Sequence, residues 1–219
     1  DKWALLSNRR AVAAGESGRF KEEIVPVPVP QRRGEPVLFE KDEHPRSDTS
    51  LEALSKLRSV LGGVSTAGNS SSESDGASVC LVTSKEKAKE LSIEPMAHIK
   101  AYAASGADPL RAWKSVPAAV DVALKKAALS LARIDLIEIH EAFAAQILAN
   151  FRELGLTEKD YDRVNVNGSC VSIGHPVGAT GARILTTLLY EMRRRSAKYG
   201  LIAICGGGGM GACMILERA

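Results

Sequence analysis

The chain has 219 residues, of which 45% are hydrophobic and 25% are charged, and its 29 basic and 26 acidic side chains give a formal charge of +3. This composition is ordinary for a globular protein and excludes a disordered tail, while the even charge balance gives no sign of a nucleic-acid partner. No apolar run approaches the ~20 residues that cross a bilayer, so no transmembrane segment is expected. Four cysteines without CxxC spacing argue against a disulfide scaffold and favour free thiols in a reducing compartment.

The first half of the chain predicts few regular elements, because proline, glycine and serine interrupt its apolar periodicity. Apolar residues at helical spacing predict helices, alternating valine and proline are typical of an edge strand or an extended connector, and an unbroken apolar run predicts a buried strand. In chain order we expect a helix over 1–18, an edge strand or connector over 24–30, a surface loop over 32–50, a short helix over 51–60, a buried strand over 77–82, and a helix over 84–91 capped by Ser84.

The second half alternates apolar strand patterns with amphipathic helix patterns. Strands are expected over 98–104, 136–139, 164–166, 201–204 and 212–216, and helices over 116–131, 141–154 and 181–195. Strands that alternate with helices before a closing strand pair predict an α/β layer with a mixed sheet.

Three clusters of reactive and small residues lie in this second half. Each one follows a predicted strand or precedes a predicted helix, where α/β folds usually hold their sites. The first is the run HEAF at residues 140–143. Its His140 could hold a water or donate a hydrogen bond to a developing oxyanion; the alternative is a histidine that only caps the next helix.

The second cluster, residues 167–181, holds His175 between glycines and directly before Pro176. The glycines let a substrate approach the backbone, and the proline restricts how the histidine is presented. The helix expected from Gly181 directs its positive end at this loop, which suits a thiolate or an oxyanion. His175 is a candidate general base, since imidazole titrates near neutral pH; the alternative is a glycine-rich turn with an incidental histidine.

The third cluster is Cys205 followed by four glycines, at the end of a predicted strand. Four consecutive glycines cost conformational entropy that a structural turn alone would not require. We expect a thiol proton donor beside an oxyanion hole of backbone N–H groups, against the alternative of a buried thiol beside a loose hairpin. Cys80 and Cys213 fall inside apolar strand patterns and Cys170 shares the His175 loop, so these three are expected to be packing thiols.

These clusters, in this order, resemble the C-terminal signatures of the thiolase family. The matching runs are HEAF at 140–143, GHPVGATGAR at 174–183 and CGGGG at 205–209. Earlier runs agree with the family as well: GRFKEEIVP at 18–26, DEHPR at 42–46, TAGN at 66–69 and DGA at 75–77. The ordered set extends over nearly the whole chain. The resemblance implies a layered α/β fold with a mixed five-stranded sheet in the C-terminal domain.

The same resemblance implies cleavage of 3-ketoacyl-CoA by free CoA, or the reverse Claisen condensation. His175 matches the histidine that activates the nucleophilic thiol and helps to bind the thioester oxygen. Cys205 matches the second catalytic cysteine, which exchanges protons with the acetyl-CoA carbanion and with incoming CoA, and the Gly207 N–H contributes to the second oxyanion hole. His140 stands where many relatives carry asparagine and would position the oxyanion-hole water; the histidine form resembles the degradative, fatty-acid-oxidation branch, including trifunctional-enzyme thiolase subunits.

Further expectations concern ligands and partners. Ala67 and Ser71 match positions that contact the CoA pantetheine, and Phe143 would line the acyl pocket. Acyl-CoA and CoA are substrates, so no cofactor is expected, and no group of histidines and carboxylates shows metal-ligand spacing, so no metal site is expected. The resemblance implies a homodimer or tetramer, with a β-oxidation subunit as a further partner, in the bacterial cytoplasm or the mitochondrial matrix.

The resemblance divides the chain into a partial loop domain over 1–65, a remnant of the N-terminal thiolase domain over 66–93 and a C-terminal thiolase domain over 94–219. The family's nucleophilic cysteine belongs to an N-terminal half without a counterpart here, and none of the four cysteines matches it. The chain opens at Asp1 without a methionine or a signal peptide. We therefore expect the C-terminal part of a 3-ketoacyl-CoA thiolase that is inactive alone and exposes an apolar face.

Two other readings stay open at this point. The chain could be a naturally short, non-catalytic thiolase-like subunit that binds CoA ligands or scaffolds a partner. It could also be a related condensing enzyme of lipid synthesis, although such enzymes lack this form of the histidine and cysteine-glycine loops. The sequence encoded before Asp1 distinguishes the first of these readings from a thiolase fragment.

Overall fold

The computed structural model describes residues 1–219 and is built around a four-stranded mixed sheet. The strands are β3 (Ala97–Gly106), β4 (Leu136–Ile139), β5 (Tyr199–Gly206) and β6 (Met210–Arg218), in the order β3-β6-β5-β4. β4 and β5 are parallel, whereas the other two pairs are antiparallel. Because β4 and β5 are parallel neighbours, their carboxyl ends meet at one edge of the sheet.

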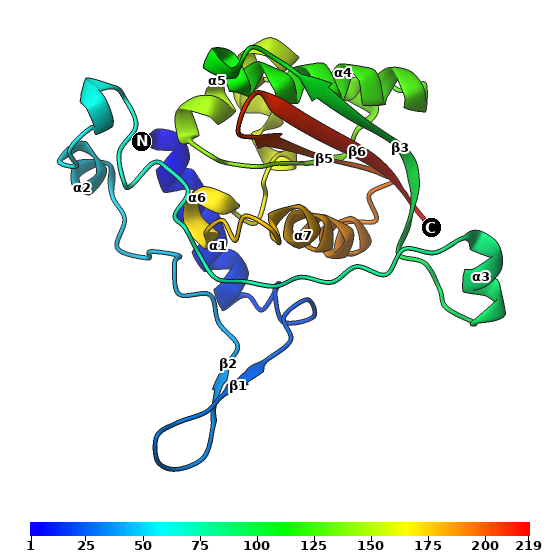
Figure 1. Cartoon of the computed structure of the whole chain (residues 1–219), viewed down its shortest axis with the longest axis horizontal. Helices are drawn as coiled ribbons and strands as arrows, with labels where there is room; N and C mark the ends of the chain where they lie inside the picture. Colours follow the sequence, from blue (N-terminus) through cyan, green and yellow to red (C-terminus); the bar gives the residue numbers. More distant parts are fainter.

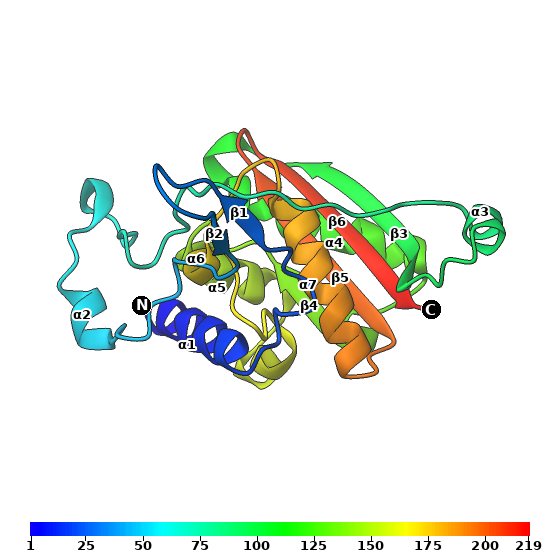
Figure 2. The ribbon, with the colours of Figure 1, turned by 90° about the horizontal axis from the view of Figure 1, so that it is seen from below.

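Helices cover both faces of this sheet, as Figures 1 and 2 show. α4 (Ser115–Ala127) and α5 (Ala144–Leu154) lie on one face, and α7 (Thr180–Arg194) lies across the other. α1 (Lys2–Glu16) packs against the short α6 (Cys170–Ile173) beside α7. The layered α/β architecture expected from the alternating pattern is thus confirmed.

Each face of the sheet has its own apolar core. In β5, Leu201 and Ala203 join the cluster under α4 and α5, whereas Ile202 between them joins the cluster under α7. This alternation follows from the two-residue side-chain period of a strand. Ile184 and Leu188 of α7 are almost fully buried against the second face, as the predicted apolar stripe requires. The edge where β4 and β5 end is therefore held rigidly from both sides.

The fifth expected strand, over 164–166, does not form, so the expectation of five strands is corrected to four. Val164 makes only an isolated bridge to Ile137. Asn165 has a left-handed backbone with φ of 47°, which ends the extended run, and its side-chain amide instead accepts from the Ile139 N–H at 2.8 Å and donates to the Ile139 carbonyl at 2.9 Å. The amide of Asn165 thus takes the place of a neighbouring strand beside β4.

The expected buried strand over 77–82 is also wrong. This segment is extended but unpaired, with Val79 91% and Leu81 74% exposed. No strand lies alongside to take its backbone hydrogen bonds; instead the side chains of Ser78 and Cys80 contact the Thr186 hydroxyl of α7, at 3.4 and 3.5 Å. An apolar run predicts a buried strand only when a partner strand is available.

Two short strands in the first half form a hairpin that projects from the body (Figure 1). β1 (Val27–Val29) pairs with β2 (Val37–Phe39), so the edge strand expected over 24–30 is present, but part of the loop expected over 32–50 is a second strand. The helices α2 (Leu51–Ser55) and α3 (Lys85–Glu90) are found near their expected positions, and Ser84 caps α3 by accepting from the Lys87 N–H.

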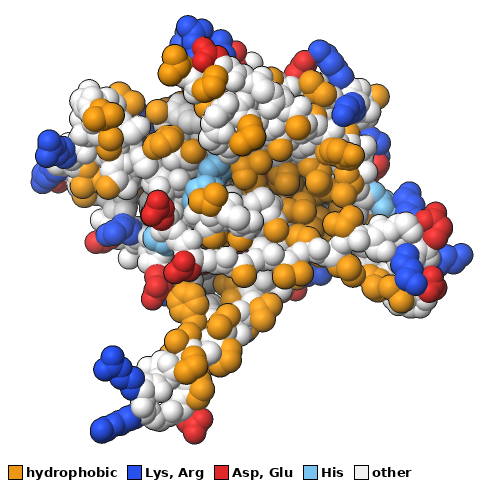
Figure 3. Space-filling model, in the orientation of Figure 1, with side chains coloured by type: hydrophobic (Ala, Val, Ile, Leu, Met, Phe, Trp, Pro, Cys, Tyr) orange, Lys and Arg blue, Asp and Glu red, His pale blue; other side chains and the backbone are white.

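Apolar side chains are exposed along this hairpin and on the body next to it (Figure 3). Val27, Val37 and Leu38 are 53–58% exposed, and their neighbour Val25 is 82% exposed. These four residues belong to the first half of the chain, so the apolar face expected on the C-terminal part stays a prediction. No helix has both the length and the apolar character needed to cross a membrane.

Candidate active site

His140 lies directly after β4, at the sheet edge where β4 and β5 both end. Its backbone N–H donates to the Ala203 carbonyl of β5 at 2.8 Å, which fixes the residue to the sheet. The side chain is only 2% exposed, and burial together with the nearby positive charge of Arg183 lowers the pKa of His140 to about 4. The ring is therefore neutral at pH 7. α5 begins only at Ala144, so His140 is not the cap residue of that helix.

His175 enters the same region from the loop between α6 and α7. Its N–H donates to the Ser72 carbonyl at 2.9 Å, so the serine-rich run of residues 70–75 lies against this loop. Gly174 has φ of +102°, and a Cβ there would lie 2.2 Å from the Ser74 hydroxyl oxygen, so only glycine fits this approach.

The tautomer of His175 follows from its hydrogen bonds. Its Nδ1 lies 2.7 Å from the Thr180 hydroxyl oxygen, and that hydroxyl donates its single proton to the Pro176 carbonyl at 3.0 Å. Thr180 must therefore accept from His175, which places the ring proton on Nδ1 and leaves Nε2 with a free lone pair. A general base needs such a free lone pair, and the role of Thr180 in providing it could not be read from a sequence pattern.

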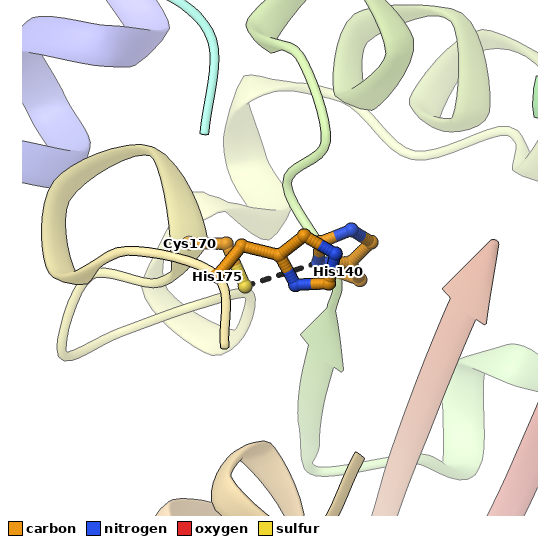
Figure 4. A group of neighbouring side chains, drawn as sticks. All are labelled: His140, Cys170 and His175. Atoms are coloured by element: carbon orange, nitrogen blue, oxygen red, sulfur yellow. Dashed lines mark hydrogen bonds between the residues drawn. The ribbon is translucent and has the colours of Figure 1, made fainter. Parts of the chain in front are cut away.

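The two imidazoles face one another with ring centroids 4.2 Å apart (Figure 4). Cys170 lies beside them, with its Sγ 3.0 Å from His140 Nδ1, and Arg183 Nη2 donates to the same sulfur at 2.9 Å. The ligand atoms of His140, Cys170 and His175 all lie within 4.8 Å of one another. The sequence analysis considered only histidines and carboxylates as metal ligands, and it did not foresee this group of two imidazoles and a thiol.

Cys205 is the penultimate residue of β5, next to the end of β4 that His140 follows. The thiol is partly buried, and burial raises its pKa, with the neighbouring Cys170 adding to the rise. A raised pKa keeps this sulfur protonated at neutral pH, as a proton donor requires. The exposed Gly207 that follows makes no backbone hydrogen bond with its N–H, which stays available to an oxyanion. The tight turn to β6 requires the positive φ of Gly208 and Gly209.

Glu141 supports the histidine loops and was missed by the sequence analysis. It is fully buried, and its two carboxyl oxygens accept four hydrogen bonds from three separate parts of the chain. The donors are the Trp3 indole at 2.8 Å, the Ser7 hydroxyl at 2.8 Å, the Asn165 amide at 2.9 Å and the Val171 N–H at 3.0 Å. One side chain thus ties α1 to the loop of His140 and to α6.

Arg183 is the central positive charge behind the site. Its Nη2 donates to Cys170, whereas its Nε and Nη1 are buried without a hydrogen-bond partner. Glu138 of β4 lies near it and is 2% exposed, and burial raises the pKa of Glu138 well above its usual range. The positive charge of Arg183 also acts on the neighbouring His140, whose pKa it helps to lower.

Glu23 supports a prediction on pH. Burial raises the pKa of Glu23 to about 7, although the Thr187 hydroxyl donates to it at 3.0 Å. Since the folded protein binds this proton more tightly than the unfolded chain, the free energy of unfolding falls as pH rises from about 4.5 to 7. Glu23→Gln keeps the acceptor for Thr187, so we expect it to remove this fall and to stabilise the protein by about 2 kcal/mol at pH 8.

Urea unfolding at pH 5 and pH 8 measures this difference. The exposed neighbour Glu22, which pairs with Arg193, provides the matched control, and Glu22→Gln should leave the pH dependence unchanged. An equal loss of stability with pH in Glu23→Gln and the parent protein contradicts the prediction.

Of the three residues expected to bind substrate, Ala67 lines one of two cavities, whereas Ser71 and Phe143 line neither. Ala67 lines a cavity of about 320 Å³ that also contains Arg46 and Val171. The Ser71 hydroxyl does not line it; this group donates to the Ala142 carbonyl at 3.2 Å and so fixes the His140 loop. Phe143 begins the next segment and is 46% exposed. A second cavity of about 720 Å³ is bounded by Gly174, Pro176 and Arg183, together with acidic residues of the first half.

The geometry thus defines an α/β protein with two facing imidazoles and a protonated thiol at one sheet edge, which is an arrangement for acid–base chemistry. The model of the thiolase C-terminal domain matches residues 93–218, and that of the thiolase N-terminal domain matches residues 1–86. The chain therefore belongs to the thiolase family.

Individual relatives agree with this assignment. The chain is 50% identical over 220 residues to an acetyl-CoA acetyltransferase of Pseudomonas aeruginosa and 45% identical over 221 residues to a beta-ketoadipyl-CoA thiolase of Acinetobacter baylyi; it is matched in full by both and spans 55% of each. Among solved structures, the Bacillus anthracis acetyl-CoA acetyltransferase matches 99% of the chain over 54% of its own length, with 44% identity and a TM-score of 0.94.

A solved structure of human mitochondrial 3-ketoacyl-CoA thiolase in complex with CoA matches the whole chain over 54% of its own length, with 39% identity and a TM-score of 0.91. The chain thus spans about 55% of the length of the curated relatives it matches. All of these relatives are acyltransferases or thiolases by name, so acyl transfer is the activity of the family.

Proposed function

We infer that this chain supplies the acid–base half of a thiolase site that transfers acyl groups between a thiol and CoA. The observation that carries the proposal is the pair of facing imidazoles of His140 and His175, placed at the sheet edge where Cys205 lies near the end of β5. In this role His175 Nε2 takes the proton of an attacking thiol. His140, which is neutral, positions a water or the thioester oxygen.

Cys205 moves the second proton. When the bond between the α- and β-carbons of a 3-ketoacyl-CoA breaks, the acetyl-CoA carbanion takes the thiol proton of Cys205, and the Gly207 N–H stabilises the developing enolate oxygen. CoA then attacks the acyl thioester and gives its own proton to the Cys205 thiolate. The sulfur that leaves the acyl group takes back its proton from His175, which restores the starting state. The raised pKa of Cys205 suits a group that must be protonated when the carbanion forms.

The attacking thiol is not supplied by this chain. Cys170 is fully buried, Cys213 lies in the core with its pKa raised to about 12, and Cys80 lies on the exposed segment that contacts α7. We therefore propose that the chain is inactive by itself and acts with a nucleophilic cysteine outside its 219 residues. We further propose the fatty-acid-oxidation type of thiolase, in view of His140 and of the match to human 3-ketoacyl-CoA thiolase.

The test uses the chain by itself and a fusion. The amino-terminal part of the Pseudomonas aeruginosa relative, which this chain does not match, is joined ahead of Asp1. We expect the fusion to cleave acetoacetyl-CoA in the presence of CoA, whereas the chain by itself should not. Cleavage is measured as the loss of absorbance of the acetoacetyl-CoA enolate. Cys213→Ser in the fusion is the control, because that thiol lies away from the site.

The outcome decides between the readings. Activity of the chain by itself contradicts the proposal of an external nucleophile. A folded fusion without activity favours the alternative of a non-catalytic subunit that binds CoA ligands, and CoA binding to the chain by calorimetry then measures that function.

A further inference from the structure

Cys170 takes no step in the chemistry proposed above, although it lies beside the two catalytic imidazoles (Figure 4) and accepts a hydrogen bond from the guanidinium of Arg183. Two imidazoles and a thiol that converge on one point form a ligand set that prefers soft or borderline metal ions. We propose that His140, Cys170 and His175 bind a divalent cation of this class, with Zn²⁺ as the best match.

The distances fit this ion. Tetrahedral bonds of ~2.1 Å to nitrogen and ~2.3 Å to sulfur place ligand atoms ~3.5 Å apart. In the structure His140 Nδ1 and Cys170 Sγ are 3.0 Å apart, and all three ligand atoms lie within 4.8 Å of one another. Displacements of about 1 Å or less therefore bring the three atoms into a coordination sphere, and the fourth position is left to water or a substrate atom.

The surroundings of the ligands already orient them. The bond from His175 Nδ1–H to Thr180 leaves Nε2 free, and a histidine that donates its other ring N–H is the usual form of a metal ligand. Arg183 donates to Cys170 Sγ at 2.9 Å and so holds the sulfur in place beside the two imidazoles.

The three ligands come from separate elements with fixed positions. His140 is held at the end of β4, Cys170 is the first residue of α6, and His175 follows that helix. His140 and Cys170 are buried, whereas His175 is partly exposed, so a cation from solvent enters on the His175 side. This placement differs from an adventitious surface site, in which side chains are mobile and solvated.

Binding of the cation does not require acyl transfer by this chain. One consequence does rest on the proposed function: a cation that takes the lone pair of His175 removes the base, so Zn²⁺ would inhibit the fused enzyme and a chelator would restore it. The binding test below is made on the 219-residue chain alone, so that its failure and a failure of the proposed function can be told apart.

The experiment titrates the metal-free, reduced chain with Co²⁺ as a spectroscopic probe. A thiolate ligand gives a sulfur-to-cobalt charge-transfer band in the near ultraviolet, and a tetrahedral site gives intense visible bands. We expect one equivalent of Co²⁺ to produce both, Zn²⁺ to remove them by displacement, and Mg²⁺ to have no effect. Cys170→Ser should abolish the charge-transfer band, and both Cys170→Ser and His175→Ala should weaken Zn²⁺ binding at least about tenfold.

The other thiols provide matched controls. Cys205→Ala changes the thiol at the same sheet edge, and Cys80→Ser changes the thiol on the extended segment; both should retain the bands and the affinity. The proposal is overturned if no charge-transfer band forms, if the band survives in Cys170→Ser, or if it disappears in Cys80→Ser. Should Cys170→Ser not fold, as judged by circular dichroism, His140→Asn decides the same question, since it removes a ligand and should weaken Zn²⁺ binding at least about tenfold.

Discussion

Replacing His175 by alanine in the fused enzyme lowers kcat by about 10²–10⁴-fold, because the attacking thiol then has no base in place. The effect depends on one ring nitrogen, Nε2, which is free only while Nδ1–H is bound by Thr180. KM should change far less than kcat, since the imidazole contributes mainly to the transition state.

Thr180→Val separates the base from its positioning. The imidazole remains, but Nδ1 loses its partner, so both tautomers become populated and kcat falls by a smaller factor than in His175→Ala. The pH dependence of kcat, measured from pH 5 to 9, should have its acidic limb shifted in Thr180→Val. In His175→Ala the acidic limb should be lost. A His175→Ala enzyme with more than a tenth of the parent kcat would contradict the role of His175 as the base.

Replacing Glu141 by alanine lowers the free energy of unfolding by about 3–5 kcal/mol. The fully buried carboxyl group accepts four hydrogen bonds, and its loss leaves the Trp3 indole and the Val171 N–H without their partner and removes one bond each from Ser7 and Asn165. α1 loses both of its side-chain bonds to this loop, so its amide protons should exchange faster than in the parent protein.

Urea unfolding at pH 7 measures the loss, and Glu138→Gln is the matched control. Glu138 is a buried glutamate of β4 whose pKa is raised by burial, so a neutral amide of the same size in its place should cost about 1 kcal/mol or less. Equal stability losses in Glu141→Ala and Glu138→Gln would contradict the prediction that the hydrogen bonds to Glu141 stabilise the protein.

The site motifs could be placed from the sequence because each one ends a strand or begins a helix. His140 directly follows β4, and Cys205 lies near the end of β5. Because these strands are parallel neighbours, their carboxyl ends lie at the same edge of the sheet. The start of α7 after the His175 loop was predicted from the glycines and the apolar stripe. These three positions depend on local patterns, which a sequence shows directly.

The supporting residues could not be predicted, because their partners are distant in the sequence. Glu141 accepts from Trp3, 138 residues away, and Asn165 replaces a strand with its side-chain amide. The contact of Cys170 with Arg183 and His140 likewise depends on how α6 and α7 pack on the sheet. A buried hydrogen-bond network has no period, so only a polar residue in an otherwise apolar run, such as Glu138, could have indicated it.

Errors in the predicted elements have the same origin. The run 77–82 has strand composition but no neighbouring strand in this chain, and residues 141–143 continue the helix pattern although Phe143 is extended with φ of −146°. In both cases the local propensity was outweighed by the contacts available. Boundaries at Ala127 and Ala144 differ from those expected for the same reason.

The bond between Trp3 and Glu141 also bears on how the protein is synthesised. The ribosome makes α1 well before the loop that holds it, and 138 residues separate the two partners. At bacterial or eukaryotic elongation rates this interval lasts roughly 7–28 s, during which the apolar side of α1 has no native surface to cover it. The nascent chain should therefore engage a chaperone early, and slowing translation between the two segments should raise the fraction that aggregates.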